Sequence, residues 1–150
     1  MSPDEAARDL YRRVIEGWNA GDAEAMAAPI AADGLMIGFD GSQLVGRDEI
    51  AAELGRIFAD HETAKYVTKV RRVWELGADA GLLWALVGMP SPETSEIMPD
   101  RNAVQTLLAT QGAEGWSVAL FQTTPAELHG RDDLSEALTR ELGEAQAEQD

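Results

Sequence analysis

The stretch from Arg101 to Pro125 constrains the fold of this chain more than any other. Two runs rich in β-forming residues, 102–111 and 116–124, flank the short connection Gly112-Ala113-Glu114-Gly115. A connection of this length that begins and ends with glycine is typical of a β-hairpin. Both faces of the two runs are largely apolar, so we expect the hairpin in the centre of a sheet that is covered on both sides.

Counting outward from a Gln111–Trp116 pair predicts which residues of the hairpin lie opposite each other. Side chains alternate between faces with a period of two, so this register brings Gln105 opposite Gln122 on an otherwise apolar face. A buried amide without partners costs about 1–3 kcal/mol. Two interpretations follow: the glutamines bond to each other and to nearby backbone, or they line a cavity and bind a ligand carbonyl or hydroxyl.

Periodic apolar residues in the first sixty positions predict three helices. The predicted helices span about 3–18, 23–28 and 46–60. Asn19-Ala20-Gly21 ends the first of them, and the ring of Pro29 ends the second because it clashes with the preceding turn. The N-terminal part of the chain is therefore helical.

Strands follow these helices and precede a final helix. Besides the hairpin, the predicted strands span 35–39, 43–45, 65–76 and 82–89, and the proline-rich segment 90–99 is an irregular loop. From Arg131 a terminal helix carries Leu134, Leu138 and Leu142 on one face, and its end frays from about Glu144.

This order of elements predicts an α+β fold in one domain. We expect residues 1–130 to form the domain and residues 131–150 to be its C-terminal helical extension. Three N-terminal helices can cover one face of a curved, mostly antiparallel sheet and leave a cavity inside the fold.

The charge and composition exclude several classes of function. The chain has 27 acidic and 12 basic residues and a formal net charge of -15. Nucleic-acid binding requires Lys and Arg to neutralise phosphates, so we expect no nucleic-acid partner, and anionic membranes are disfavoured for the same reason. No apolar stretch of about 20 residues can cross a bilayer. No secretory signal is visible, so a cytoplasmic location is expected. The absence of cysteine excludes thiolate and disulfide chemistry.

Short motifs along the chain resemble a known family. Trp18-Asn19-Ala20-Gly21-Asp22, followed by Ala32-Asp33-Gly34, resembles the opening of the SnoaL-like proteins, which belong to the superfamily named after nuclear transport factor 2. Arg101 through Leu107, Gly115-Trp116 and Phe121-Gln122-Thr123 resemble the SgcJ/EcaC branch, found among proteins of natural-product pathways. The resemblance covers roughly residues 4 to 125.

The resemblance implies a cone-shaped α+β barrel, also described as cystatin-like, with a deep pocket and a homodimer formed through the sheet. Relatives of this fold include ketosteroid isomerase, scytalone dehydratase and polyketide cyclases, while others only bind, so fold does not give function. The chain has no G-x-G-x-x-G motif and no phosphate loop, and we expect no cofactor.

Two residues are candidates for acid–base chemistry. His61, at the end of the third predicted helix, titrates near neutral pH and can act as a general acid or base; alternatively it only interacts with the helix dipole. Asp40 follows an apolar strand, and burial in a dry pocket would raise its pKa toward that of a general base. Asp40-Gly41 is also an ordinary turn dipeptide, and we favour the turn. The two histidines, His61 and His129, lie far apart in sequence, so we expect no histidine-rich metal site; an all-carboxylate site stays open.

Five large side chains are candidate walls of the cavity. They are Trp18, Met36, Phe39, Trp84 and Met98. Aromatic and methionine side chains are more often plain core than ligand contacts, and in a cone-shaped fold the same residues can serve as both. We expect them to contact a small hydrophobic molecule together with the two glutamines of the hairpin.

These patterns favour a pocket protein for a small hydrophobic or polyketide-like molecule. If it is an enzyme, the expected chemistry is cofactor-free isomerisation, cyclisation or dehydration. Asp40 or His61 then moves the proton, and the amides of Gln105 and Gln122 stabilise the oxyanion. One alternative is a non-catalytic binding or accessory protein of a natural-product pathway. Another is a dimeric interaction module.

Overall fold

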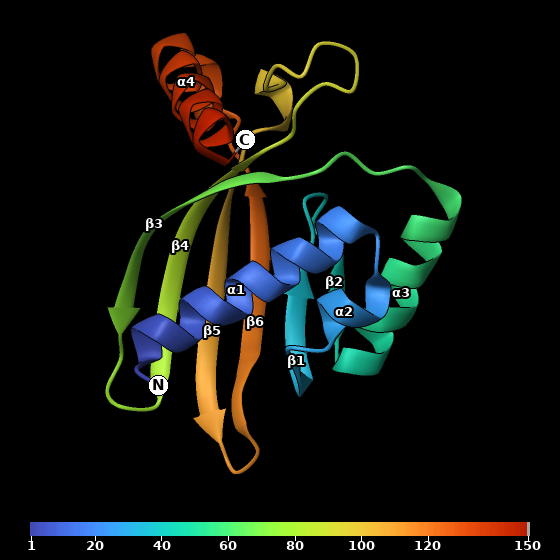
Figure 1. Ribbon diagram of the computed structural model, residues 1–150, viewed down its shortest axis with the longest axis vertical. Helices are drawn as coiled ribbons and strands as arrows, with labels where there is room; N and C mark the ends of the chain where they lie inside the picture. Colours follow the sequence, from blue (N-terminus) through green and yellow to red (C-terminus); the bar gives the residue numbers. More distant parts are fainter. Residues whose placement is uncertain (150) are drawn as a thin grey trace.

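The computed structural model describes residues 1–149 and has three N-terminal helices on one side of a curved sheet (Figure 1). The helices are α1 (Pro3–Ala20), α2 (Ala23–Ala27) and α3 (Arg47–Asp60). In Figure 1, α1 crosses in front of the sheet, and α2 and α3 lie beside one another at one edge. The predicted α+β arrangement is confirmed.

Six strands form a single sheet in the order β2-β1-β6-β5-β4-β3. The strands are β1 (Ile30–Ile37), β2 (Gln43–Val45), β3 (Val67–Glu75), β4 (Ala80–Gly88), β5 (Ala103–Gly112) and β6 (Gly115–Pro125). β1 and β6 are parallel, and all other neighbours are antiparallel. The hairpin β5–β6 thus lies in the middle of the sheet, as the sequence predicts.

Helix α1 begins and ends where its sequence allows. The Ser2 side chain accepts from the backbone N–H of Glu5, and the Glu5 carboxylate accepts from the N–H of Ser2, which satisfies two N-terminal donors. Gly21 ends the helix with φ 63°, a conformation that glycine adopts without strain. The buried face of α1, with Tyr11 and Val14, packs into the main core against β4 and β5.

The register within the hairpin differs from the predicted one. Gln111 pairs with Trp116 as expected, but a β-bulge between Leu108 and Ala109 shifts every later pair. Gln105 consequently lies opposite Thr123, and the predicted Gln105–Gln122 pair is wrong. One extra residue in β6 fits into the bulge and reverses which side chains face the core beyond it. No amino-acid pattern marked this position in advance.

Strand β1 starts earlier than predicted. The Ala32-Asp33-Gly34 triplet, which precedes the predicted strand 35–39, lies inside β1, where the pairing with β6 shifts between Ile30 and Leu35. A Cβ on Gly34 would lie 2.6 Å from the Cγ2 atom of Ile30, so only glycine permits this close approach. A triplet whose composition is typical of a turn therefore forms an irregular part of strand β1.

The C-terminal helix α4 (Asp132–Gln149) packs on the face of the sheet opposite α1. Leu142 is fully buried, in contact with a second core that includes Leu86 and Ile97. The predicted fraying from Glu144 is wrong: Ala145 is buried, and the side chain of Gln149 donates to the backbone oxygen of Thr68 at 3.1 Å. Tertiary contacts keep the last turn in place.

The outer face of the sheet is only partly covered, which corrects the expectation that the hairpin is covered on both sides. α4 contacts β3 and β4 at one end, while Val104, Thr106 and Leu108 of β5 remain half-buried. Trp84 on β4 is 37% exposed and stacks on Trp74 of β3, with 6.1 Å between ring centroids. Among residues 1–149, no helix is both long and apolar enough to cross a membrane.

Candidate functional site

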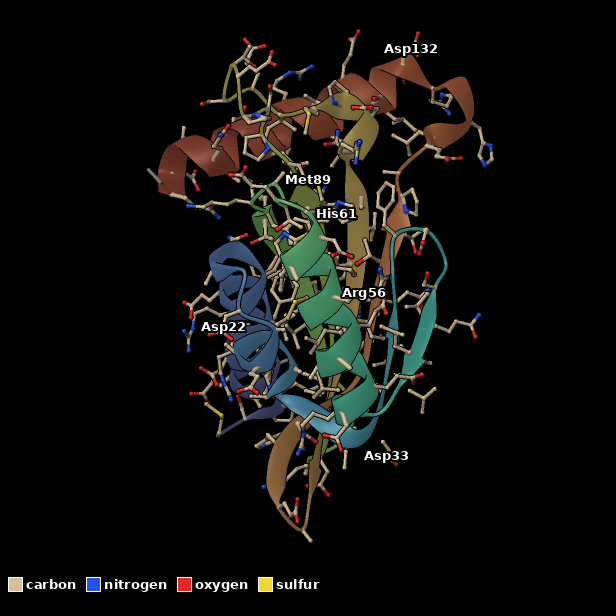
Figure 2. The ribbon with its side chains drawn as sticks, turned by 90° about the vertical axis from the view of Figure 1, so that its right-hand side faces the viewer. Asp22, Asp33, Arg56, His61, Met89 and Asp132 are labelled. Carbon is tan, nitrogen blue, oxygen red and sulfur yellow. The ribbon has the colours of Figure 1, made fainter. Side chains whose placement is uncertain are left out.

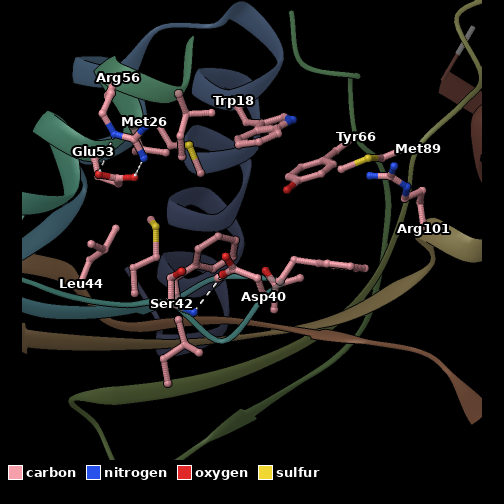
Figure 3. Close-up of a pocket in the computed structure, with 18 residues that line it drawn as sticks. Trp18, Met26, Asp40, Ser42, Leu44, Glu53, Arg56, Tyr66, Met89 and Arg101 are labelled. Atoms are coloured by element: carbon pink, nitrogen blue, oxygen red, sulfur yellow. Dashed lines mark hydrogen bonds and ion pairs between the residues drawn. The ribbon is translucent and has the colours of Figure 1, made fainter. Parts of the chain in front are cut away.

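A cavity of about 430 Å³ lies between the helices and the concave face of the sheet (Figure 3). Most of its lining is apolar and comes from α1, α2, α3, β1, β2 and β6. The apolar lining includes Trp18, Met26, Met36, Leu44, Leu54 and Phe121. A mostly apolar concavity of this size with a few polar groups is typical of a small-molecule site.

The segment that ends α1 builds one wall of this cavity. The indole N–H of Trp18 donates to the backbone oxygen of Ala64 at 2.9 Å, and its ring stacks on Tyr66 with 4.6 Å between centroids. Asn19 forms two hydrogen bonds to the backbone of Tyr66, of 2.7 Å and 3.2 Å. Asp22 then caps α2 by accepting from the N–H of Ala25. The motif Trp18 to Asp22 therefore fixes the segment before β3 and places the Tyr66 ring at the cavity.

Two linked, buried hydrogen bonds lie behind the wall of the cavity that includes Thr123. Tyr11 donates its hydroxyl hydrogen to Oε1 of Gln105 at 2.6 Å, and Nε2 of Gln105 donates to the hydroxyl of Thr123 at 3.2 Å. Gln105 has no exposed surface and does not line the cavity, whereas Thr123 does. Burial raises the pKa of Tyr11, so this phenol stays a neutral donor. Gln105 thus reaches the cavity only through Thr123.

Tyr66 contributes a second hydroxyl to the cavity. In Figure 3 its oxygen points into the hollow between Trp18 and Asp40. Burial raises the pKa of Tyr66, and no hydrogen bond offsets this effect. The hydroxyl is therefore protonated at neutral pH and can donate a hydrogen bond to a bound molecule.

Four charged side chains line the cavity with compensating signs. Glu53 and Arg56 of α3 form an ion pair within one turn. Asp40 accepts the N–H of Ser42 at 2.9 Å, and hydrogen bonding from the Ser42 side chain and from this N–H lowers the pKa of the carboxyl from its usual value. Arg101 lies at the rim, next to Met89 and close to Tyr66 in Figure 3.

The structure brings together some of the residues predicted as a site. Trp18, Met36, Phe39 and Asp40 all line the cavity. Asp40 lies in the turn between β1 and β2 and is exposed, so the hydrogen bonds from Ser42 outweigh the desolvation that was expected to raise its pKa. The fold therefore does not bury this carboxylate in a dry pocket.

The other predicted residues lie outside the cavity lining. His61 follows the last residue of α3, is exposed, and only caps the helix through its backbone N–H (Figure 2). Trp84 and Gln122 point to the outer face of the sheet, because their strand neighbours Ala85 and Phe121 belong to the main core. Met98 lies in the loop before β5, where its N–H donates to the Met89 oxygen at 2.9 Å.

The cavity residues that the sequence analysis did not name as site candidates include Tyr66, Arg101 and Thr123, which carry polar groups. Thr123 belongs to a motif that the sequence analysis did quote, but the bulge was needed to see which way it points. Tyr66 precedes a strand and carries no motif of its own. Within residues 1–149, no group of three or more His, Asp or Glu side chains is arranged to hold a metal ion.

Solved structures share this architecture. A domain of unknown function with a cystatin-like fold from Nostoc punctiforme superposes with a TM-score of 0.78 at 27% identity, covering 99% of this chain and 97% of that one. A ketosteroid isomerase-like protein from Erwinia carotovora gives a TM-score of 0.63 at 19% identity, with 83% and 96% covered. An NTF-2 like protein of unknown function from Shewanella oneidensis gives 0.65 at 18%, with 81% and 98% covered. The chain therefore shares the α+β fold of these NTF2-like and cystatin-like structures.

The family follows from the sequence itself. The SnoaL-like domain family matches residues 11–106, which is more than half of the 150 residues. The chain belongs to the SnoaL-like domain family. No curated protein matches it.

Proposed function

We propose that this protein binds a small, largely apolar molecule in the cavity between its helices and its sheet. The observation that carries the proposal is the lining: aromatic and methionine side chains surround about 430 Å³, and a few polar groups converge on it. Trp18 and Tyr66, stacked with their planes 4° apart, offer a flat surface to a ring system.

Binding without turnover is the function that the cavity supports best. A general base for neutral pH needs a pKa near 7, which burial or like charges provide. Asp40 is exposed, and its pKa is lowered, away from that value. We therefore favour a carrier or accessory protein for a hydrophobic or polyketide-like metabolite. The motifs at 101–107 and 121–123 support membership of the SgcJ/EcaC branch, whose members occur in natural-product pathways.

Cofactor-free proton transfer is the second candidate, because Asp40 and the Tyr66 hydroxyl line the same cavity. In this mechanism Asp40 removes a proton next to a ligand carbonyl, and Tyr66 donates a hydrogen bond to the developing oxyanion. The hydroxyls of Tyr66 and Thr123 thus take the role of oxyanion donors that the sequence analysis gave to Gln105 and Gln122.

We also propose a homodimer formed through the outer face of the sheet. The stacked Trp74 and Trp84 are flanked by Arg71 and Arg72, whose guanidinium groups lie 5.5 Å and 4.5 Å from the Trp84 and Trp74 ring centroids. Large aromatic rings and arginines are enriched at protein interfaces.

Two neighbouring residues of β2 provide the test of binding. Leu44 lines the cavity, whereas Val45 points away from it and is 62% exposed. Fluorescence titration with the neutral apolar probe N-phenyl-1-naphthylamine should show saturable binding that Leu44→Trp abolishes and Val45→Trp leaves intact. Absence of saturable binding, or equal binding by both variants, would overturn the proposal.

A second measurement separates the carrier from the enzyme. Deuterium exchange next to the carbonyl of 2-tetralone, followed by NMR in D₂O, reports proton abstraction directly. The carrier proposal expects no acceleration over buffer. Acceleration that Asp40→Asn removes would establish proton transfer instead.

A further inference from the structure

Three side chains of the cavity keep hydrogen-bond donors that remain available to a ligand. The Tyr66 hydroxyl lines the cavity and has no hydrogen bond that stabilises its charged form. Thr123 already accepts from Gln105, so its own hydroxyl hydrogen is left to donate elsewhere. Arg101 takes part in none of the ion pairs among residues 1–149. A guanidinium has donors and no acceptor.

The carboxylates of the cavity are engaged within the protein. Glu53 binds the guanidinium of Arg56, with one contact of 3.2 Å to Nε. Asp40 accepts the N–H of Ser42. A ligand that enters the cavity therefore meets three side chains with free donors, Tyr66, Thr123 and Arg101, and the remaining lone pairs of Asp40.

Strand register brings these donors to one end of the cavity. Val67 pairs with Gly88 and Val87 pairs with Ala103, so the residues just beyond these pairs, Tyr66, Met89 and Arg101, lie at the same end of neighbouring strands. Figure 3 shows Tyr66, Met89 and Arg101 close together. On β6, Thr123 lies opposite Gln105, two residues further into the sheet than the Ala103–Pro125 pair. Figure 3 shows the apolar side chains of Met26 and Leu44 on the opposite side of the cavity, where Glu53 and Arg56 neutralise each other.

We propose that the ligand is an apolar ring compound that carries a carboxylate, with its ring in the apolar end and its carboxylate at the donor end. Arg101 supplies the countercharge, and the hydroxyls of Tyr66 and Thr123 donate to the carboxylate oxygens. This inference rests on the proposed binding function and names its ligand class. Because the net charge of the chain is -15, an anion approaches against a repulsive field, and Arg101 provides local compensation.

Isothermal titration with 2-naphthoate and 2-naphthylmethanol tests the inference, since the two probes share a ring and differ in charge. We expect 2-naphthoate to bind about tenfold more tightly than the alcohol, the size of one charge-assisted hydrogen bond. If both bind equally, or the alcohol binds more tightly, the cavity proposal stands and the carboxylate inference falls. If neither binds, both fall.

Arginine variants locate the charge recognition. Arg101→Gln should weaken 2-naphthoate about tenfold and leave 2-naphthylmethanol unchanged. The control is Arg140→Gln, which removes another exposed arginine, located on α4 and outside the cavity lining, and should change neither probe. Equal weakening by Arg101→Gln and Arg140→Gln would show that net charge, not the site, governs binding, and would overturn the inference.

The Thr123→Val variant tests whether the Thr123 hydroxyl donates to the ligand. It should weaken 2-naphthoate more than 2-naphthylmethanol, because a hydrogen bond to a carboxylate is stronger than one to an alcohol. Equal weakening of both probes would assign Thr123 a packing role and remove it from the proposal.

Discussion

The hydroxyl of Tyr11 on α1 donates a 2.6 Å hydrogen bond to the side-chain oxygen of Gln105 on β5, 94 positions further along the chain. Both side chains are buried, 3% and 0% exposed. This bond joins the first helix to the centre of the sheet. It also sets the orientation of the Gln105 amide, whose nitrogen then donates to Thr123.

Removing the Tyr11 hydroxyl should destabilise the protein. Tyr11→Phe leaves a buried amide oxygen without its donor, at a cost of about 1–3 kcal/mol in the free energy of unfolding. Tyr66→Phe is the matched control, because the Tyr66 hydroxyl faces the cavity and should cost clearly less. Urea unfolding followed by circular dichroism measures both. Equal decreases in the free energy of unfolding would show that the Tyr11–Gln105 hydrogen bond contributes no more to stability than the Tyr66 hydroxyl does.

Two glycines of the helices should respond in opposite ways to alanine. A Cβ on Gly17 would lie 2.5 Å from backbone atoms of Met26, so Gly17→Ala forces α1 and α2 apart and should cost at least about 1–3 kcal/mol. Gly143 on α4 has nothing within 4 Å of such a Cβ. Gly143→Ala should therefore stabilise by about 0.5–1 kcal/mol through helix propensity. Thermal unfolding of the two variants should move the midpoint in opposite directions. A downward shift for both would contradict this view.

Asp40 should titrate below its ordinary range. Hydrogen bonds from the side chain and the backbone N–H of Ser42 lower the pKa of Asp40 in the folded state. Because the folded pKa is lower than the unfolded one, this stabilisation is complete above the unfolded value and is lost as the pH falls through the folded value. Carboxyl carbon NMR should show the Asp40 transition below the model-peptide value of 3.8. A transition above it would revive Asp40 as a base of raised pKa.

Disrupting the tryptophan pair should prevent dimer formation. Trp84→Arg places a charge in the centre of the proposed interface, and light scattering after gel filtration should then give the mass of one chain, against two for the original protein. Leu76→Arg, which changes a 52% exposed residue beyond the end of β3, is the control and should leave the dimer intact. A single-chain mass for the original protein at high concentration would refute the proposed dimer. Binding of 2-naphthoate should be the same for Trp84→Arg as for the original protein, because Trp84 lies outside the cavity lining.

The elements could be predicted from the sequence because local patterns determine them. Helix α1 carries its cap at Ser2 and its stop at Gly21, and the β5–β6 connection from Gly112 to Gly115 lies where its glycines indicate. Apolar periodicity also predicts that Leu142 faces a core. These features depend on residues within a few positions of each other.

The site was harder to predict from the sequence because its geometry depends on segments that are far apart in the chain. Asn19 predicts the end of a helix, yet its amide binds the backbone of Tyr66, 47 positions away, and this contact has no local signature. Gln105 was predicted to have a glutamine partner, but its partners are Tyr11 and Thr123. Buried polar groups must be paired, but the sequence does not say with whom.

The bulge at Leu108 and Ala109 has a consequence for comparing this chain with its relatives. A relative that lacks one residue near Ala119 would form a regular ladder and still present the equivalents of Phe121 and Thr123 to the cavity. A relative of identical length without the bulge would instead present the equivalents of Leu120 and Gln122. If cavity residues were assigned position by position from an ungapped alignment of such sequences, residues of the inner face of β6 would be matched with residues of the outer face. An alignment with one gap near Ala119 would instead match the residues that face the cavity.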